Sequence, residues 1–166
     1  MKKRIILVTG GQRSGKSLFA EQMAKSLSAN PVYVATAHVE DEEFRERVRI
    51  HQERRDPEWT TIEEEKYLSR HTVEGRVVLV DCCTLWLTNF FSEASPLSQI
   101  EAEFDRLTAQ EATFIFVTNE IGLGGTSANE VQRQFTDLLG AFNQYVAARA
   151  DEVYMLVSGL SIKLKG

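Results

Sequence analysis

The sequence lacks three features that would place it in whole classes of protein. No apolar run approaches the roughly 18 residues of a membrane-spanning helix, so we expect no membrane insertion. There is no excess of positive charge, because the formal net charge is -5, and this argues against a nucleic-acid-binding protein. No internal repeat, low-complexity tract or linker divides the 166 residues, so we expect a single domain over residues 1–166.

The amino terminus lacks a complete signal peptide. Met1-Lys2-Lys3-Arg4 and the apolar residues after it imitate the start of one. The apolar stretch is short, however, and leads directly into a glycine-rich motif. We therefore expect a cytoplasmic protein.

Cysteine is also scarce, with only Cys82 and Cys83 in the chain. Adjacent cysteines have the wrong spacing for a zinc site and are unpromising for a structural disulfide. We interpret both as small, half-buried residues at the end of a strand, and a reactive thiol is the alternative.

The most informative motif present is Gly10-Gly11-Gln12-Arg13-Ser14-Gly15-Lys16-Ser17, which reads G-x-x-x-x-G-K-S. In such a loop, backbone N–H groups surround nucleotide phosphates, the lysine reaches the outer phosphates and the serine can ligate Mg²⁺. The context fits, because an apolar strand pattern precedes the loop and a helical pattern follows it. The sequence therefore predicts a nucleoside triphosphate site; a glycine-rich strand–helix turn without a ligand is the alternative.

Strand and helix patterns alternate along the chain, which predicts a three-layer α/β fold with a mostly parallel sheet. The expected strands are Arg4–Thr9, Val32–Thr36, Arg76–Asp81, Thr113–Thr118, Glu152–Val157 and Ser161–Leu164. The expected helices are Lys16–Leu27, Asp41–Arg54, Leu97–Ala109 and Asn129–Ala148. The short connection at 158–160 predicts a hairpin at a sheet edge. In the last helix an apolar stripe is expected to face the core: Val131, Phe135, Leu138, Leu139 and Phe142.

In open sheets of this type, ligands bind beyond the carboxyl ends of the strands. This rule places the segments 10–17, 36–38, 81–84, 118–125 and 158–160 near the nucleotide. Asp81 ends an apolar strand, and we expect it to hold Mg²⁺ rather than only to cap a turn. Glu120 lies in a glycine-rich turn after another strand, where a substrate role and simple turn chemistry are equally open.

Arginines are concentrated in the segment 45–55, which also contains His51. On a helix, Arg47, His51, Arg54 and Arg55 fall within an arc of about 100°, an arrangement that could hold a triphosphate against an imidazole. From the pattern alone, a solvated charged face, with His51 closing an apolar stripe, is the stronger interpretation.

At this point the residues resemble the bifunctional adenosylcobinamide kinase / adenosylcobinamide-phosphate guanylyltransferase family of cobalamin biosynthesis. The similarity covers nearly the whole chain, and Arg13 within the phosphate loop distinguishes it from most small kinases. The blocks that carry the similarity are Ile6 to Ser17, Tyr33-Val34-Ala35-Thr36-Ala37, Asp41-Glu42-Glu43, Arg47-Val48-x-x-His51, Trp59-x-Thr61-x-Glu63, Val80-Asp81-Cys82-x-Thr84-Leu85-Trp86-Leu87-Thr88-Asn89, Val117-Thr118-Asn119-Glu120-Ile121-Gly122, Asn143-Gln144 and Ala150-Asp151-Glu152-Val153 to Val157-Ser158-Gly159.

The resemblance implies two reactions. The first phosphorylates the aminopropanol hydroxyl of adenosylcobinamide with ATP or GTP, and the second transfers GMP from GTP to that phosphate through a GMP–histidine intermediate. The matching histidine is His51, and this outweighs the interpretation from the pattern alone. The resemblance also implies a RecA-like phosphate-loop fold and a homotrimer. It implies nucleotide contacts at Gly10 to Ser17, Thr36, Ala37, His38, Gln52, Glu53, Arg54, Arg55, Glu63 and Asp81, with Lys16 catalytic and Mg²⁺ held by Ser17 and Asp81.

Overall fold

The fold is organised around one seven-stranded sheet with the strand order β3-β2-β4-β5-β1-β6-β7. The structure, a computed structural model, describes residues 2–38, 42, 45, 46, 49, 50, 53 and 57–166. The strands are β1 (Arg4–Gly10), β2 (Val32–Ala35), β3 (Thr60–Glu63), β4 (Val77–Asp81), β5 (Thr113–Asn119), β6 (Glu152–Val157) and β7 (Leu160–Lys165). β1 to β6 run parallel and β7 pairs antiparallel with β6, so the predicted sheet and edge hairpin are both confirmed.

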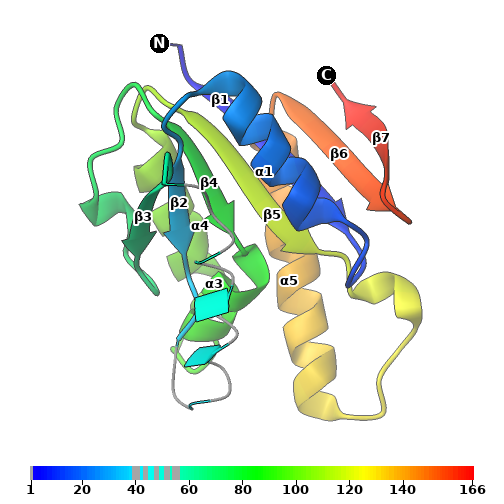
Figure 1. Cartoon of the computed structure of the whole chain (residues 1–166). Coiled ribbons are helices and arrows are strands. Elements are labelled where there is room, and N and C mark those ends of the chain that lie inside the picture. Colours follow the sequence, from blue (N-terminus) through cyan, green and yellow to red (C-terminus); the bar gives the residue numbers. More distant parts are fainter. Residues whose placement is uncertain (1, 39–41, 43–44, 47–48, 51–52, 54–56) are drawn as a thin grey trace.

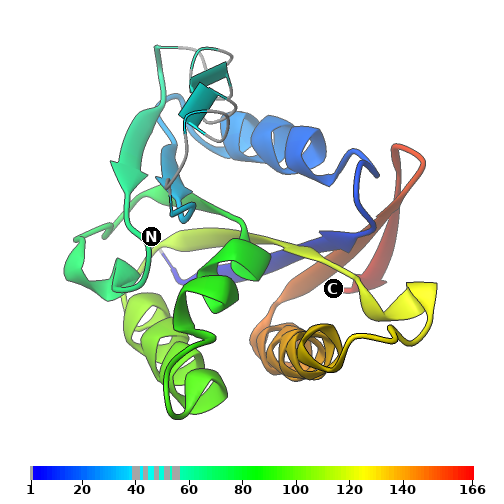
Figure 2. The same cartoon turned by 90° about the horizontal axis from the view of Figure 1, so that it is seen from below.

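Helices cover both faces of this sheet. The α-helices are α1 (Lys16–Leu27), α3 (Cys83–Phe90), α4 (Pro96–Thr108) and α5 (Glu130–Arg149), and short 3-10 helices occupy Leu68–Arg70 (η1) and Gly122–Gly124 (η2). Figure 2 shows α1 on one side of the sheet and α3, α4 and α5 on the other. Within the described part of the chain, no helix combines the length and apolar character that crossing a bilayer requires.

Alternation along the strands explains the two hydrophobic layers. Ile5 and Leu7 of β1 belong to the cluster under α3, α4 and α5, whereas Ile6 and Val8 belong to the cluster under α1. A strand that is buried on both faces reads as a continuous apolar run, which is why these strands are visible in the sequence.

Three features differ from the sequence prediction. β3 and α3 were not expected; β3 is a short, largely exposed edge strand and α3 has only eight residues. The predicted core role of Val131 is wrong, because this side chain is 60% exposed in the first turn of α5, beyond the sheet. Leu139 and Phe142 are fully buried, and Phe135 and Leu138 pack against the same core.

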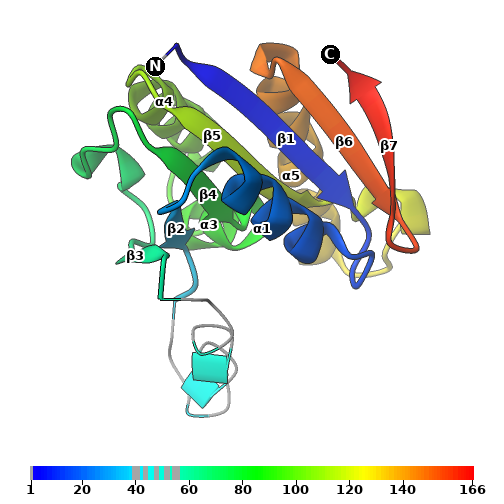
Figure 3. The same cartoon turned by 45° about the horizontal axis from the view of Figure 1, so that its top comes forward.

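The carboxyl ends of the parallel strands meet at one edge, and the loops that follow them lie together (Figure 1). Figure 3 shows the chain termini at the opposite edge, away from the loop between β1 and α1. The sheet therefore brings the predicted site segments to one side of the molecule.

Candidate functional site

The loop between β1 and α1 has a conformation that depends on glycine. Gly15 has a φ of 93° and forms the N-cap of α1, a left-handed conformation that residues with a side chain rarely adopt. Arg13 is also left-handed, with a φ of 59°. The backbone thus reverses direction before the helix starts, which directs the amino-terminal end of α1 toward the loop.

Close packing inside the loop explains its first glycine. A Cβ atom on Gly10 would lie 2.7 Å from Ser14 Oγ and 2.8 Å from the carbonyl oxygen of Leu156 on the neighbouring strand. Within the residues that the structure describes, Ser14 Oγ is also the only buried side-chain polar atom without a hydrogen-bond partner. A buried hydroxyl without a partner, at a helix amino terminus, fits a site that takes an anionic ligand.

Lys16 is the buried cation of this loop, whereas Arg13 is exposed. Its side chain is largely buried, and Nζ donates a 3.1 Å hydrogen bond to the carbonyl oxygen of Gly11. Burial lowers the pKa of Lys16, and the nearby Asp81 carboxylate only partly offsets this. Because this ammonium group is desolvated and lies next to backbone donors, a bound phosphate group would stabilise it strongly through charge and hydrogen bonding.

Asp81 ends β4 beside the loop, and its carboxylate lies within reach of two hydroxyl groups. Ser17 Oγ lies 3.4 Å from Asp81 Oδ2, and the Tyr33 hydroxyl donates a 2.9 Å hydrogen bond to the same oxygen. A carboxylate and a serine hydroxyl are hard oxygen ligands, so the pair fits Mg²⁺ bound jointly with nucleotide phosphates. The described ranges contain no group of three or more His, Cys, Asp or Glu side chains that could hold a metal ion.

The carboxyl end of β2 is fixed by the helix that follows β4. The buried Thr36 hydroxyl donates to the carbonyl oxygen of Cys82 at 2.9 Å and accepts from its N–H at 3.1 Å. Asn89 Nδ2 donates to the carbonyl oxygens of Thr36 and Glu65 at 2.7 and 2.9 Å. These bonds fix Thr36, the first residue of the predicted 36–38 segment, and nucleotide contact there stays a prediction.

A pocket of about 430 Å³ lies next to the 36–38 segment. It is lined by His38, Glu65, Lys66, Leu85, Thr88, Asn89 and Ser92. His38 Nδ1 is 2.5 Å from Glu65 Oε1, and both side chains are about half exposed. The predicted contact residue Glu63 ends β3, where the strand register places it level with Ala35, the neighbour of Asp81. The polar side chains around β2 and β3 therefore lie at the same sheet edge as the phosphate loop.

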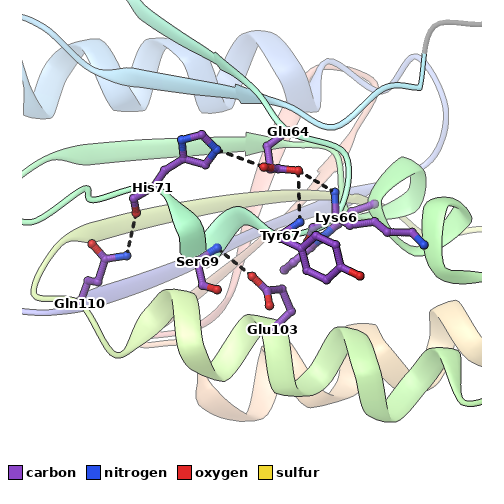
Figure 4. A network of polar contacts seen from close by, with 8 residues as sticks. Glu64, Lys66, Tyr67, Ser69, His71, Glu103 and Gln110 are labelled. Atoms are coloured by element: carbon purple, nitrogen blue, oxygen red, sulfur yellow. Dashed lines mark hydrogen bonds and ion pairs between the residues drawn. The ribbon is translucent and has the colours of Figure 1, made fainter.

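The segment after β3 is held by a partly buried polar network (Figure 4). Glu64 accepts from His71 Nε2 at 3.2 Å and from the backbone N–H groups of Lys66 and Tyr67 at 3.4 and 3.3 Å. Burial alone raises the pKa of Glu64, but these hydrogen bonds outweigh it and leave the pKa below its ordinary value. The Lys66 carbonyl oxygen accepts from the buried Trp86 indole at 2.9 Å, which fixes the pocket rim to α3.

In the turn after β5, the polar groups of Glu120 and Asn119 form local hydrogen bonds. Glu120 Oε1 accepts from the N–H of Gly122 at 3.0 Å, and the Glu120 N–H donates to the carbonyl oxygen of Gly10 at 2.9 Å. Asn119 is fixed to Thr84 Oγ1 by its backbone and side-chain N–H groups at 3.2 and 3.1 Å. The observed bonds thus favour the turn interpretation and join this turn to the phosphate loop.

Most of the arginine-rich segment lies outside the described residues, including the predicted His51, Gln52, Arg54 and Arg55. The described residues of the expected helix 41–54 are 42, 45, 46, 49, 50 and 53, and all are helical. Glu53 is exposed and accepts from Arg49 at 3.2 Å, and Arg49 also pairs with Glu46. These ion pairs fit the solvated-face interpretation for the described part of the segment.

Both thiols are poor nucleophiles in this setting. Burial, together with the charge of Asp81, raises the pKa of Cys82 to about 11, and burial raises that of Cys83 further above its ordinary range. The structural interpretation of the pair fits Cys82, which is partly buried just after β4, but Cys83 is fully buried rather than half-buried and begins α3.

Sequence reasoning missed two residues that shape the site. Tyr33 belongs to an expected strand and to a family-like block, but no pattern along one strand indicates that its hydroxyl meets a carboxylate on another. Asn89 lies on α3, a helix that was not expected, although it closes one of the family-like blocks. Its position at the end of that block was the available signal.

Solved structures with the same architecture confirm the fold. The flagellar accessory protein FlaH from Methanocaldococcus jannaschii matches with a TM-score of 0.55 and 17% sequence identity, over 98% of this chain and 78% of that protein. A protein from Pyrococcus horikoshii OT3 matches with a TM-score of 0.58 and 9% identity, over 100% of this chain and 88% of that protein. At such identities the likeness concerns the fold alone.

Sequence relatives are much closer. The bifunctional adenosylcobalamin biosynthesis protein CobP from Pseudomonas aeruginosa is 39% identical over 167 residues, which cover 96% of each chain. The bifunctional adenosylcobalamin biosynthesis protein CobU from Escherichia coli K12 is 34% identical over 97% of this chain and 99% of that protein. The sequence profile described as cobinamide kinase / cobinamide phosphate guanyltransferase matches residues 6–164. With its phosphate loop, its Asp81–Ser17 pair and this full-length similarity, the chain belongs to the cobinamide kinase / cobinamide phosphate guanyltransferase family.

Proposed function

We propose that this protein phosphorylates adenosylcobinamide and then guanylylates the product, with both reactions at the phosphate loop. The observation that carries the proposal is the buried Lys16 ammonium group within a glycine-dependent loop, in a chain of this family. ATP or GTP serves the first reaction and GTP the second. The corrinoid is a small-molecule substrate, and the net charge of -5 gives no support for a nucleic-acid partner.

In the kinase reaction, the aminopropanol hydroxyl attacks the γ-phosphorus and the bond to the β-phosphate oxygen breaks. The products are adenosylcobinamide phosphate and a nucleoside diphosphate, and the hydroxyl proton is released. Lys16 and the N–H groups of residues 10–17 offset the charge that spreads over the phosphoryl oxygens. Thr36, Ala37, His38 and Glu63 are proposed nucleotide contacts at the neighbouring strand ends.

In the guanylyltransferase reaction, a neutral nitrogen of His51 attacks the α-phosphorus of GTP and pyrophosphate leaves. A phosphate oxygen of adenosylcobinamide phosphate then attacks the same phosphorus, the P–N bond breaks and His51 is regenerated. The product is adenosylcobinamide-GDP. Gln52, Glu53, Arg54 and Arg55 are proposed contacts on the same segment. The role of His51 rests on the family resemblance, since His51 lies outside the described residues.

Mg²⁺ is the proposed metal, and Ser17 and Asp81 would hold it. When bound, it supplies positive charge that neutralises the phosphate oxygens. Lys16 provides the protein's own charge at the same place, and Tyr33 holds the Asp81 carboxylate in position.

The deciding experiment uses GTP labelled at the α-phosphate. The protein should acquire a label that is labile in acid and stable in base, and His51→Ala should abolish it. His71→Gln is the matched control, because His71 is bonded to Glu64 and Gln110 away from the phosphate loop. No label with intact cobinamide phosphorylation would leave a kinase only. Tight GTP binding with neither activity would instead indicate a non-catalytic nucleotide switch.

We further propose that the protein is cytoplasmic and that it forms the homotrimer that the family resemblance implies. Sedimentation velocity tests the assembly, and the expected species has three times the monomer mass of 18.8 kDa. A monomer or dimer at working concentration would contradict the proposal for the assembly but not for the two reactions.

A further inference from the structure

The turn between β6 and β7 lies against the phosphate loop. β6 and β7 are joined by Ser158 and Gly159, which have φ values of 52° and 78°. Two left-handed residues between paired strand ends form the turn expected for a two-residue hairpin. Both turn residues are exposed. Figure 3 shows the turn at the same edge of the sheet as the phosphate loop.

Two observations define this contact. The N–H of Gly159 donates a 2.8 Å hydrogen bond to the carbonyl oxygen of Ser14. A Cβ atom on Gly15 would lie 3.2 Å from Gly159 Cα, so the two backbones approach as closely as glycine permits. The contact joins residues from opposite ends of the chain.

The hydrogen bond also fixes the orientation of one peptide unit. The Ser14–Gly15 peptide is trans, so its carbonyl and N–H groups point in opposite directions. Because the Ser14 carbonyl is held by the turn, the N–H of Gly15 is directed away from the turn and its orientation is fixed. A donor fixed in advance binds an anion without first losing conformational freedom.

We propose that Gly159 is a positioning residue for nucleoside triphosphates, acting through the Ser14–Gly15 peptide. This inference rests on the proposed function of the phosphate loop. It assigns to the hairpin a role in nucleotide affinity that is common to both reactions, with no contact between Gly159 and the reacting atoms.

The chain offers a matched control in Gly75. Its φ is 73°, its N–H donates to a carbonyl oxygen (that of Glu111, at 2.9 Å), and a Cβ there would meet nothing within 4 Å. Gly159 shares all three properties, so Gly75→Val and Gly159→Val introduce the same backbone strain at opposite edges of the sheet. Gly159→Asn keeps the N–H and tolerates the left-handed conformation.

The experiment measures the Kd of MgGTP, the nucleotide KM and the adenosylcobinamide KM, with melting temperatures. Gly159→Val should raise the nucleotide Kd and KM about tenfold and leave the adenosylcobinamide KM unchanged. Gly75→Val and Gly159→Val should lower the melting temperature by similar amounts, but Gly75→Val should leave nucleotide affinity unchanged. Gly159→Asn should bind nucleotide with nearly the affinity of the wild-type protein. If Gly159→Val prevents folding, Gly159→Ala replaces it, with a smaller shift in the same direction.

The inference is overturned if the wild-type protein binds MgGTP and the folded Gly159→Val or Gly159→Ala variant binds it equally well. It is also overturned if Gly75→Val weakens binding to the same extent. Failure of the wild-type protein to bind nucleotide or transfer phosphate would instead overturn the proposed function.

Discussion

The hydroxyl of Tyr33 donates a 2.9 Å hydrogen bond to Oδ2 of Asp81, across two neighbouring strands of the sheet. Tyr33 is aligned with Leu79, two residues before Asp81, so its long side chain extends along the sheet face to the end of the next strand. The ring itself is buried against Trp59, with a distance of 6.0 Å between ring centroids. A packed aromatic ring thus holds the carboxylate that we propose as the Mg²⁺ ligand.

Removal of this hydroxyl should weaken Mg²⁺ binding. We expect Tyr33→Phe to raise the Mg²⁺ concentration for half-maximal phosphoryl transfer about tenfold, as is typical for partners of metal ligands. Tyr154→Phe is the control, because its hydroxyl donates to the Glu152 carboxylate at 3.0 Å near the other end of the sheet. Magnesium titrations that respond equally to the two substitutions would contradict the proposed metal site.

Lys16→Met should separate activity from stability. We expect both reactions to lose about 100-fold or more in kcat/KM, since both use the triphosphate site. Burial lowers the pKa of Lys16, so the protonated ammonium group opposes folding, and the melting temperature without nucleotide should stay the same or rise.

Lys25→Met, in the last turn of the same helix, is the control and should leave both activities unchanged. Near-normal guanylylation in Lys16→Met would show that the two reactions do not share this loop.

Glu64 should make the protein sensitive to acid. Its folded pKa lies below the ordinary 4.5, so its stabilisation is complete above that pH and is lost as the pH falls through the lowered pKa. Glu64→Gln should cost about 1–2 kcal/mol at neutral pH. Urea unfolding at about pH 7 and about pH 3.5 should show this difference shrinking in acid.

Glu74→Gln is the comparison for Glu64→Gln. The Glu74 carboxylate also accepts a hydrogen bond from a backbone N–H, that of Glu111 at 3.0 Å, but it is exposed. A loss for Glu64→Gln that does not change between the two pH values would mean that its network does not depend on the charge.

The cysteines should resist alkylation in the folded protein. With a pKa of about 11, Cys82 is almost entirely protonated at neutral pH, and Cys83 is buried. Iodoacetamide should modify neither thiol before unfolding and both afterwards, as mass spectrometry would show. Rapid modification of the native protein, with loss of activity, would restore the reactive-thiol alternative.

The elements that the sequence predicts well are those with two buried faces or a long periodic pattern. β1, β4 and β5 are continuous apolar runs, and α1 was predicted with its observed bounds. β3 escaped prediction because Thr60–Glu63 carries little apolar character at an exposed edge. α3 escaped because eight residues rich in aromatic and β-branched types resemble a strand as much as a helix.

The same division applies to the candidate site. A local motif identified the phosphate loop, and the strand-end rule placed Asp81 beside it. The Tyr33–Asp81 and Gly159–Ser14 contacts join residues on different strands and loops, and their geometry depends on strand order and register. Strand order and register cannot be derived directly from a single sequence, so such contacts are visible only in the structure.

The position of β1 between β5 and β6 has a consequence for how the protein matures. The phosphate loop is bonded on one side to the turn after β5, through Glu120 and Gly10, and on the other to the β6–β7 turn. During synthesis, the phosphate loop therefore leaves the ribosome long before the two turns that hold it have been made. Capture of nucleotide should come late in biogenesis, after the carboxyl-terminal hairpin has joined the sheet.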